Sequence, residues 1–391
     1  MTDDEREIWQ KALIEEQRLA KSGRLFQDPL LEDYLRHVGG RLIPEAAKRE
    51  PQVAFRFAVV MDPTLNAFAY PNGMIVIHSG LLARLENEAQ LACVLSHEII
   101  HVTQRHAGIL IREAKTKAVG KALAGAVLSL PLGSIGIRGG YSAATALLNL
   151  LRGHTSGRGL LKKADPIIGL GMELALIFSI SGYGEEMEQE ADVLGMDLLV
   201  RAGYDPREIP KVFALLMDTY GDRADVEMFF LGYHPANAER LKTANRLLET
   251  VYQDGIWQED WRTNAEEFLK RTRLLVRENA VLDIELGRYN TAKTQFERVL
   301  RLSPADPKAL YYLGELYRRR GEHGDIAEAH EAYRRALSSD PSYADPHKGL
   351  GLLYYRMGKR QKAKVEFTKY LQQLPLPKDA GVIKDYLLEL Q

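Results

Sequence analysis

The stretch NEAQLACVLSHEIIHVTQRHAGILI, residues 87–111, contains the pattern that decides how this chain is interpreted. Asn87 precedes Gln90 by three positions, a spacing typical of a helix N-cap, so we expect one helix over this range. Inside it, His97 and His101 are four residues apart and therefore stand on one face, one turn apart. Two neutral imidazoles at this spacing can bind a single zinc ion.

The residue between the two histidines supplies the acid–base group that such a site needs. Glu98 lies about 100° round the helix from His97, near enough to take a proton from an attacking water without binding the metal. Burying a His-Glu-His set without a metal is costly, and the apolar neighbours of the motif place it in the core. These neighbours are Leu91, Val94, Leu95 and Val102. We therefore favour a metal site over two surface histidines with an acid between them.

A catalytic zinc ion usually has three protein ligands, so a third ligand is needed from elsewhere in the chain. The metzincin pattern would require glycine at position 104 and histidine at position 107, where this chain has Gln104 and Ala107. His106 lies five residues after His101, away from the ligand face of the helix. We expect His106 to be solvated.

The better source of a third ligand is the segment EQEAD, residues 188–192. Glu188 and Asp192 are four residues apart and again share one face of a helix. Glu188 could reach the metal, while Asp192 could accept the second N–H of a ligand histidine and fix its tautomer. The alternative is a solvated, acidic helix N-terminus, and the remaining acidic residues, including Glu190, fit that description.

The other segments before residue 270 predict a mostly helical unit with a small sheet. Residues 1–50 read as helical, and the β-branched and aromatic runs 53–60 and 74–78 read as strands. Residues 116–182 form an apolar insertion whose two apolar stretches are shorter than the roughly 18 residues of a spanning helix. We favour core or lid packing for this insertion; exposed apolar patches there would instead indicate peripheral contact with a membrane.

The C-terminal third contains an internal repeat. A small residue, a second small residue, an aromatic residue and a proline recur at offsets of 12, 4 and 8, with three extra residues in the middle unit. These positions are Ala280, Ala292, Phe296 and Pro304, then Gly314, Ala329, Tyr333 and Pro341, then Gly351, Ala363, Phe367 and Pro375. The spacing resembles the tetratricopeptide repeat, a helical pair of about 34 residues. We expect three repeats, with Val382–Leu390 capping the open face of the last one.

The motifs before the repeats together resemble one peptidase family. HEIIH at 97–101 and EQEAD at 188–192 are joined by NAFAYPNG at 66–73, SGLL at 79–82 and LGYHPANAERL at 231–241. Over about residues 25–250 this set is similar to the gluzincin peptidases of the HtpX and CaaX prenyl protease type. Those relatives are embedded in the membrane, whereas this chain has no convincing membrane span.

The resemblance implies a role for each residue at the predicted metal site. His97, His101 and Glu188 would bind one zinc ion. Glu98 would act first as general base and then as proton donor. Asp192 would support a ligand histidine from behind.

The resemblance also implies residues that contact the substrate. Asn66, Ala67 and Phe68 would lie on a strand at the edge of the cleft, to which a peptide substrate adds as a further strand. His234 would stabilise the developing oxyanion or occupy the fourth zinc position and keep the enzyme inactive. Arg240 would orient His234 or bind substrate. For His234 and Arg240, an ordinary core or surface residue is the alternative.

The sequence therefore predicts an α-rich α+β fold. A gluzincin zinc metallopeptidase domain over 1–260, with a small sheet and the 116–182 insertion, precedes an α-solenoid of three repeats and a capping helix over 273–391. The expected function is that of a zinc-dependent endopeptidase that cleaves misfolded or misassembled envelope proteins. The repeats would recruit protein clients or partners to it.

Composition and charge exclude several other classes of protein. The chain has 391 residues, 46% hydrophobic and 27% charged, which is ordinary for globular domains. Lys plus Arg number 52 against 53 for Asp plus Glu, so no basic excess indicates a nucleic-acid partner. The single cysteine, Cys93, makes an intramolecular disulfide impossible and is expected to be a core residue.

Two questions stay open from the sequence. The N-terminus, MTDDEREIWQ, has no basic and then apolar leader, so the protein is cytoplasmic or its leader has been removed. The resemblance implies the periplasm or cell envelope. The rival functions are a repeat-based adaptor or chaperone with a latent or capped zinc site, and an exopeptidase that acts on small peptides.

Overall fold

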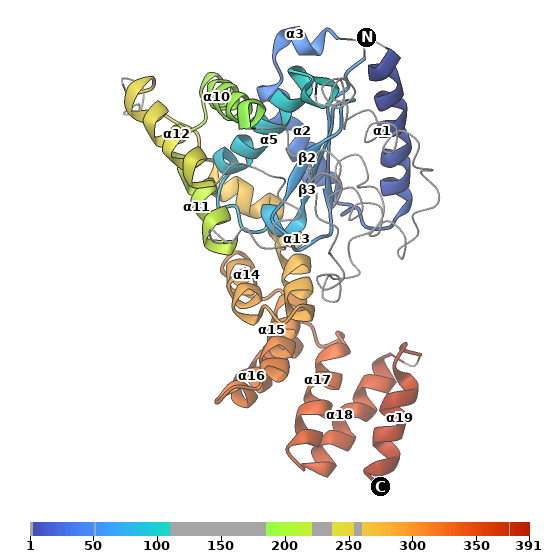
Figure 1. Ribbon diagram of the computed structural model, residues 1–391. Helices are drawn as coiled ribbons and strands as arrows, with labels where there is room; N and C mark the ends of the chain where they lie inside the picture. The colour runs from blue at the N-terminus through green and yellow to red at the C-terminus, as the bar shows by residue number, and fades with distance from the viewer. Residues whose placement is uncertain (1–2, 51, 110–184, 221–236, 254–259, 375) are drawn as a thin grey trace, which may run out of the picture. The chain divides into compact units, whose positions relative to one another are not determined.

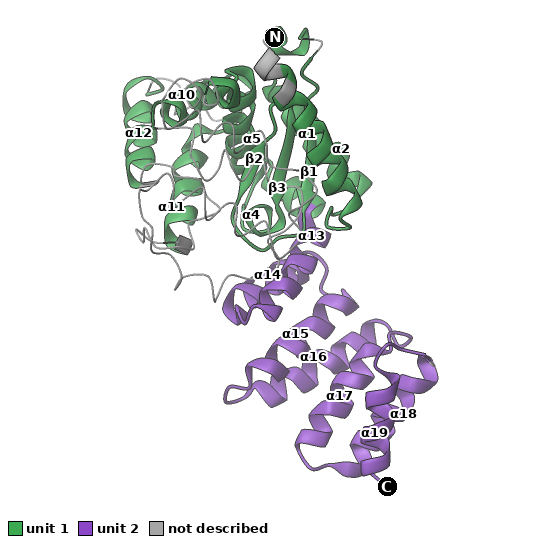
Figure 2. Cartoon of the chain, turned by 45° about the vertical axis from the view of Figure 1, so that its right-hand side comes forward, with its two compact units in different colours: residues 1–271 green, residues 272–391 purple. Residues whose placement is uncertain are grey.

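The computed structural model describes most of the chain (Figure 1). The described residues are 3–50, 52–109, 185–220, 237–253, 260–374 and 376–391. The predicted insertion at 116–182 and the predicted site residue His234 lie outside these ranges. Contacts within the chain divide it into two compact units, residues 1–271 and residues 272–391 (Figure 2). Within the described ranges, no helix has both the length and the apolar character needed to cross a membrane.

A small sheet forms one layer of the first unit. Among the described residues it has the strand order β1-β3-β2. The central strand β3 (Met74–His78) pairs in parallel with β1 (Arg56–Val60) and antiparallel with β2 (Ala67–Ala69). Ile75, Val76 and Ile77 are fully buried in the middle of the sheet. The prediction of a small sheet is confirmed, and β2 lies at one edge of it.

Helix α5 (Glu88–Thr103) is the buried centre of this unit. The Asn87 side chain accepts a hydrogen bond of 2.9 Å from the backbone N–H of Gln90, so the predicted N-cap is confirmed. The prediction that the helix continues to residue 111 is wrong. Arg105 adopts a φ of 55°, in the left-handed region, which interrupts the right-handed helix before a short helical stretch begins at His106.

A buried carboxylate fixes the first turn of α5. Glu88 is only 3% exposed, and it accepts hydrogen bonds from Tyr34 at 2.6 Å and from Tyr204 and Asn264 at 2.8 Å each. Tyr34 belongs to α2 (Pro29–Leu42), which packs on α5. Burial and the nearby Glu88 raise the pKa of both tyrosines, so both remain neutral donors. Because an unpaired buried carboxylate is costly, this network holds the helix start in one position.

Helix α10 (Glu185–Arg201) packs closely along α5. A Cβ atom on Gly195 would lie 3.2 Å from the backbone nitrogen of His97, and Ala191 is fully buried. Small residues therefore let the two backbones approach each other. Helices α11 (Ile209–Tyr220) and α12 (Asn237–Thr250) pack against each other, α11 also contacts α5, and α12 also contacts α10.

The second unit consists of helices that pack in sequence order. They are α13 (Ala265–Glu285), which begins before the unit boundary, α14 (Tyr289–Leu302), α15 (Pro307–Arg320), α16 (Asp325–Ser339), α17 (Asp345–Arg356), α18 (Arg360–Gln373) and α19 (Ala380–Glu389). In the second and third repeats the aromatic ring packs on the glycine: a Cβ on Gly314 would lie 2.5 Å from the Tyr333 ring, and one on Gly351 would lie 2.5 Å from the Phe367 ring. The predicted α-rich fold with a helical-repeat region is thus confirmed.

We predict opposite effects for two glycine-to-alanine substitutions in this unit. Gly314 lies in the middle of α15, where alanine gains about 1 kcal/mol of helix propensity, and Gly381 lies in the first turn of α19, where the gain is smaller. At Gly314 the new methyl group would collide with the fully buried Tyr333 ring, and we expect a net loss of about 1–3 kcal/mol. A Cβ atom on Gly381 would have no neighbouring atom within 4 Å, so Gly381→Ala should be neutral or stabilising. Thermal and urea unfolding of the full chain measure both; equal effects would contradict the packing described.

Candidate metal centre

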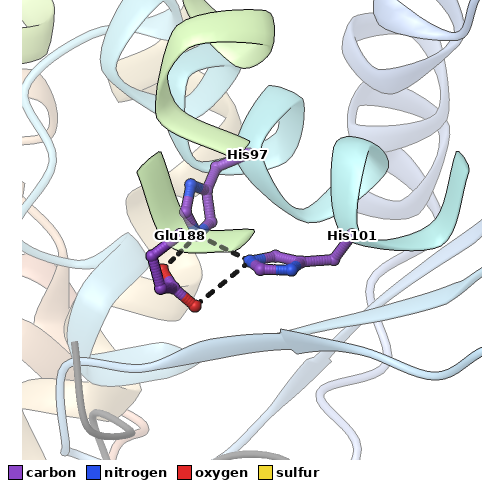
Figure 3. A group of neighbouring side chains, drawn as sticks. All are labelled: His97, His101 and Glu188. Carbon is purple, nitrogen blue, oxygen red and sulfur yellow. Dashed lines mark hydrogen bonds and ion pairs between the residues drawn. The ribbon is translucent and has the colours of Figure 1, made fainter. Parts of the chain in front are cut away.

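Three side chains from two helices converge at one point (Figure 3). His97 and His101 come from α5, and Glu188 comes from the first turn of α10. The two Nε2 atoms are 3.0 Å apart. Glu188 Oε2 lies 3.3 Å from His97 Nε2, and Glu188 Oε1 lies 3.5 Å from His101 Nε2. Among the described residues this is the one group of three or more such side chains that could hold a metal ion.

The spacing of these atoms fits a tetrahedral zinc site. Two ligand atoms, each about 2.0–2.2 Å from one zinc ion and separated by a tetrahedral angle, are about 3.3–3.6 Å apart. The three measured separations of 3.0 to 3.5 Å are close to that value. Two imidazole nitrogens and one carboxylate are also a donor set that zinc prefers. The residues present therefore fit zinc.

The charge around the histidines also favours a cation. Glu188 is fully buried beside His97. Burial by itself would lower the pKa of His97, but hydrogen bonds to Asp192 and Glu188 outweigh that effect and raise this pKa to about 10. The same negative field that favours a proton on His97 would favour a divalent metal ion in its place.

Asp192 and Arg240 lie at the Nδ1 side of the His97 ring. The Asp192 carboxylate lies 3.0 Å from His97 Nδ1. Arg240, on α12, donates to both Asp192 oxygens at 2.7 and 2.6 Å, and its guanidinium lies 4.8 Å from the centre of the Phe213 ring. Burial would raise the pKa of Asp192, but Arg240 and His97 outweigh it and hold that pKa well below its usual range. Asp192 is therefore an anion that can fix the His97 tautomer.

The prediction that His106 is solvated is wrong. This residue is fully buried. Its Nδ1 lies 2.8 Å from Nδ1 of His101, and its Nε2 lies 3.3 Å from an Oε atom of Glu190. The left-handed turn at Arg105 is the reason, since it ends the helix and redirects the chain just before His106. No rule of helical spacing could have found this contact.

Glu98 is held against the edge of the sheet. Its side chain is buried, and the backbone N–H of Ala69 in β2 donates a hydrogen bond to its carboxylate. Burial is the largest influence on this carboxyl group and raises its pKa to about 7. A carboxyl group with a pKa in this range can accept and release a proton near neutral pH.

The register of β2 determines which of its backbone groups face away from the sheet. His78 N–H donates to the Asn66 carbonyl at 2.9 Å, and Tyr70 N–H donates to the Met74 carbonyl at 2.7 Å. Hydrogen-bonded positions alternate along an antiparallel ladder, so Phe68 also faces β3. The backbone N–H and C=O groups of Ala67 and Ala69 therefore point outward from this edge.

The sequence matches known families in both units. Residues 29–248, more than half of the chain, match Peptidase family M48. The chain belongs to peptidase family M48. This family is one of metallopeptidases, enzymes that hydrolyse peptide bonds with a bound metal ion. Residues 278–325 match a tetratricopeptide repeat and residues 322–358 match a TPR repeat.

Three curated relatives are about 30% identical to this chain over the aligned residues. The Beta-barrel assembly-enhancing protease of Escherichia coli K12 is 31% identical over 291 residues, covering 71% of this chain and 48% of that protein. The Putative beta-barrel assembly-enhancing protease of Vibrio cholerae is 27% identical over 74% of this chain and 53% of that protein. The Mitochondrial metalloendopeptidase OMA1 of Arabidopsis thaliana is 30% identical over 49% of this chain and 31% of that protein. The chain spans about half the length of the first two relatives.

We predict that Asp192→Asn weakens zinc binding about 10- to 100-fold, as expected when the partner of a ligand histidine is lost. The substitution also removes the negative charge that neutralises the buried Arg240 cation, which lies 3.4 Å from His97 Nδ1. The double variant Asp192→Asn with Arg240→Gln should therefore recover part of the loss. Asp197→Asn, at a half-buried position of the same helix that pairs with Arg201, is the matched control. Competition with a chromophoric chelator measures the affinity, and equal values for the positions 192 and 197 would contradict this assignment.

Proposed function

We propose that this chain is a zinc-dependent endopeptidase. The observation that carries the proposal is the convergence of His97, His101 and Glu188. Glu98 lies beside them on α5 and is hydrogen-bonded to the edge strand β2. In the proposal the first three residues bind zinc. A bound zinc ion supplies Lewis acidity, lowering the pKa of water and polarising a carbonyl group.

The proton transfers of peptide hydrolysis fall to Glu98 in this proposal. The ionised Glu98 carboxylate takes a proton from the attacking water and later gives it to the leaving amine nitrogen. The N–H of Ala69 favours the ionised form and fixes the direction in which the carboxylate points. Asp192 and Arg240 keep His97 in the tautomer whose Nε2 carries a lone pair.

The substrate in this proposal is an extended segment of protein. The outward N–H and C=O groups of Ala67, together with the C=O of Ala69, can pair with a peptide that adds as an antiparallel or parallel strand. The Ala69 N–H is engaged by Glu98, so the same short strand would align both the substrate and the base. A strand bound along an edge needs no free terminus, which favours an endopeptidase over an exopeptidase.

We further propose that residues 1–260 act as the peptidase domain and that residues 273–391 bind protein clients or partners. The helical repeats support the second part, because stacked repeats form extended binding surfaces. We also propose misassembled envelope proteins as substrates and the periplasm as the location; the names of the bacterial relatives, which are those of proteases that enhance β-barrel assembly, support a role in such assembly. Membrane contact through 116–182 stays a prediction, as do the two roles suggested for His234.

The decisive test of the catalytic proposal uses the full chain and Glu98→Gln. We expect about one zinc per chain in both proteins by mass spectrometry, and cleavage of unfolded casein that falls about 10²- to 10⁴-fold in the variant. Glu86→Gln, at an exposed position just before the zinc helix, is the control and should cleave normally.

Two other outcomes would change the proposal. Zinc in both proteins with cleavage in neither would favour the adaptor or chaperone with a capped site, and His234→Ala should then restore cleavage. Absence of zinc from the parent protein would contradict the catalytic proposal altogether.

The edge-strand proposal predicts that Ala67→Pro impairs substrate binding but not zinc binding. Proline removes the outward N–H of residue 67 and leaves the ladder to β3 intact, because that ladder uses residues 66, 68 and 70. We expect KM for a peptide substrate to rise several-fold at unchanged zinc content. An unchanged KM would show that substrate does not pair with this edge.

A further inference from the structure

The two predicted zinc-binding histidines have different partners behind them. His97 has the carboxylate of Asp192 at its Nδ1 atom, 3.0 Å away. His101 has a second imidazole at the same place, with His106 Nδ1 at 2.8 Å and the two rings meeting edge to face at 4.9 Å between centroids. His106 is fully buried, so its orientation is fixed by packing as well as by this contact.

The tautomers of this pair follow from the ligand role of His101. Zinc binding at Nε2 requires a lone pair there, so the proton of neutral His101 must be on Nδ1. That N–H then donates to Nδ1 of His106, whose own proton must be on Nε2. This second N–H faces the Glu190 carboxylate at 3.3 Å. The hydrogen bonds thus run in one direction, from His101 through His106 to Glu190.

The backbone is shaped to make this contact. In an uninterrupted helix, residue 106 would lie about 140° round the axis from His101 and could not reach its ring. The left-handed Arg105, with a φ of 55°, ends the helix and turns His106 back towards it. The Arg105 side chain donates to Glu50 at 3.2 Å, which helps to hold the turn. A non-glycine residue in this conformation is uncommon and often lies at a functional site.

We propose that His106 and Glu190 are positioning residues that hold His101 as a zinc ligand and set the zinc affinity of the site. This inference rests on the proposed function, since it takes zinc to be the ion that His97, His101 and Glu188 bind. Partners behind ligand histidines commonly change metal affinity 10- to 100-fold. His106 would do for His101 what Asp192 does for His97, with a neutral acceptor in place of an anion.

The test compares four variants of the full chain with the parent protein. His106→Leu fills the space without an acceptor, and we expect a zinc dissociation constant about 10- to 100-fold higher. His106→Asn can place its amide oxygen near the former Nδ1 and should recover most of that loss. Glu190→Gln should have a smaller effect than His106→Leu, because Glu190 is 47% exposed. Gln104→Leu, an exposed neighbour on the same turn, is the control and should match the parent.

Three readouts separate positioning from a general loss of structure. Chelator competition gives the zinc affinity, the cobalt-substituted protein reports the ligand field through its visible spectrum, and the melting temperature of the metal-free protein reports the fold. A weakened affinity and a shifted cobalt spectrum at an unchanged metal-free melting temperature support the proposal. If His106→Leu does not fold, Glu190→Gln must still shift the cobalt spectrum, and an unchanged spectrum in that variant would overturn the proposal.

The outcomes also separate this inference from the proposed function. In one outcome the parent protein binds zinc and cleaves casein, while the variants at positions 106 and 190 bind zinc within two-fold of the parent affinity and keep its cobalt spectrum. This outcome would overturn only the role of His106 and Glu190. A parent protein that binds no zinc would overturn both.

Discussion

The close approach of α10 to α5 is the constraint on which the candidate site depends. The backbones come close at Gly195, where a Cβ atom would lie 3.2 Å from the backbone nitrogen of His97. Ala191 is fully buried in the same contact. Glu188 lies about one turn before Ala191 and about two turns before Gly195 on α10, and this contact brings it beside the two histidines of α5. The site is therefore a consequence of helix packing, and a larger residue at 195 would move its third ligand.

Buried charge is the second constraint. Glu188, Asp192 and Arg240 are largely removed from water, and each contacts a group of opposite charge or a histidine. Two carboxylates and one guanidinium give the cluster around His97 a net negative charge. This charge explains why the pKa of His97 is raised despite burial. A dication between Glu188 and the histidines would balance this charge. The carboxylate network at Glu88 plays the corresponding part at the start of α5, where it fixes the helix without a metal.

Much of this arrangement follows from patterns in the sequence. The i, i+4 spacing of His97 and His101 places both rings on one face, and the same spacing of Glu188 and Asp192 separates a candidate ligand from a residue that supports one. The repeat spacing likewise indicates which glycine packs under which aromatic ring, as at Gly314 and Tyr333. These features repeat along the sequence at helical spacings, so the spacing alone indicates them.

Other features depend on tertiary structure and could not be predicted in this way. The left-handed conformation of Arg105 has no glycine or asparagine to signal it, so both the end of α5 and the burial of His106 were missed. The contact between Glu98 and the backbone of Ala69 depends on how a strand and a helix pack across 29 positions of sequence. Likewise, the pairing of Arg240 with Asp192 joins α12 to α10, and spacing along either helix gives no indication of it.

X-ray diffraction from zinc-loaded crystals, at wavelengths on either side of the zinc absorption edge, tests the proposed zinc site most directly. We expect one anomalous peak per chain, within about 2.0–2.2 Å of His97 Nε2, His101 Nε2 and an oxygen of Glu188. A peak bound by other side chains, or no peak among these three residues in crystals that contain zinc, would contradict the proposed site.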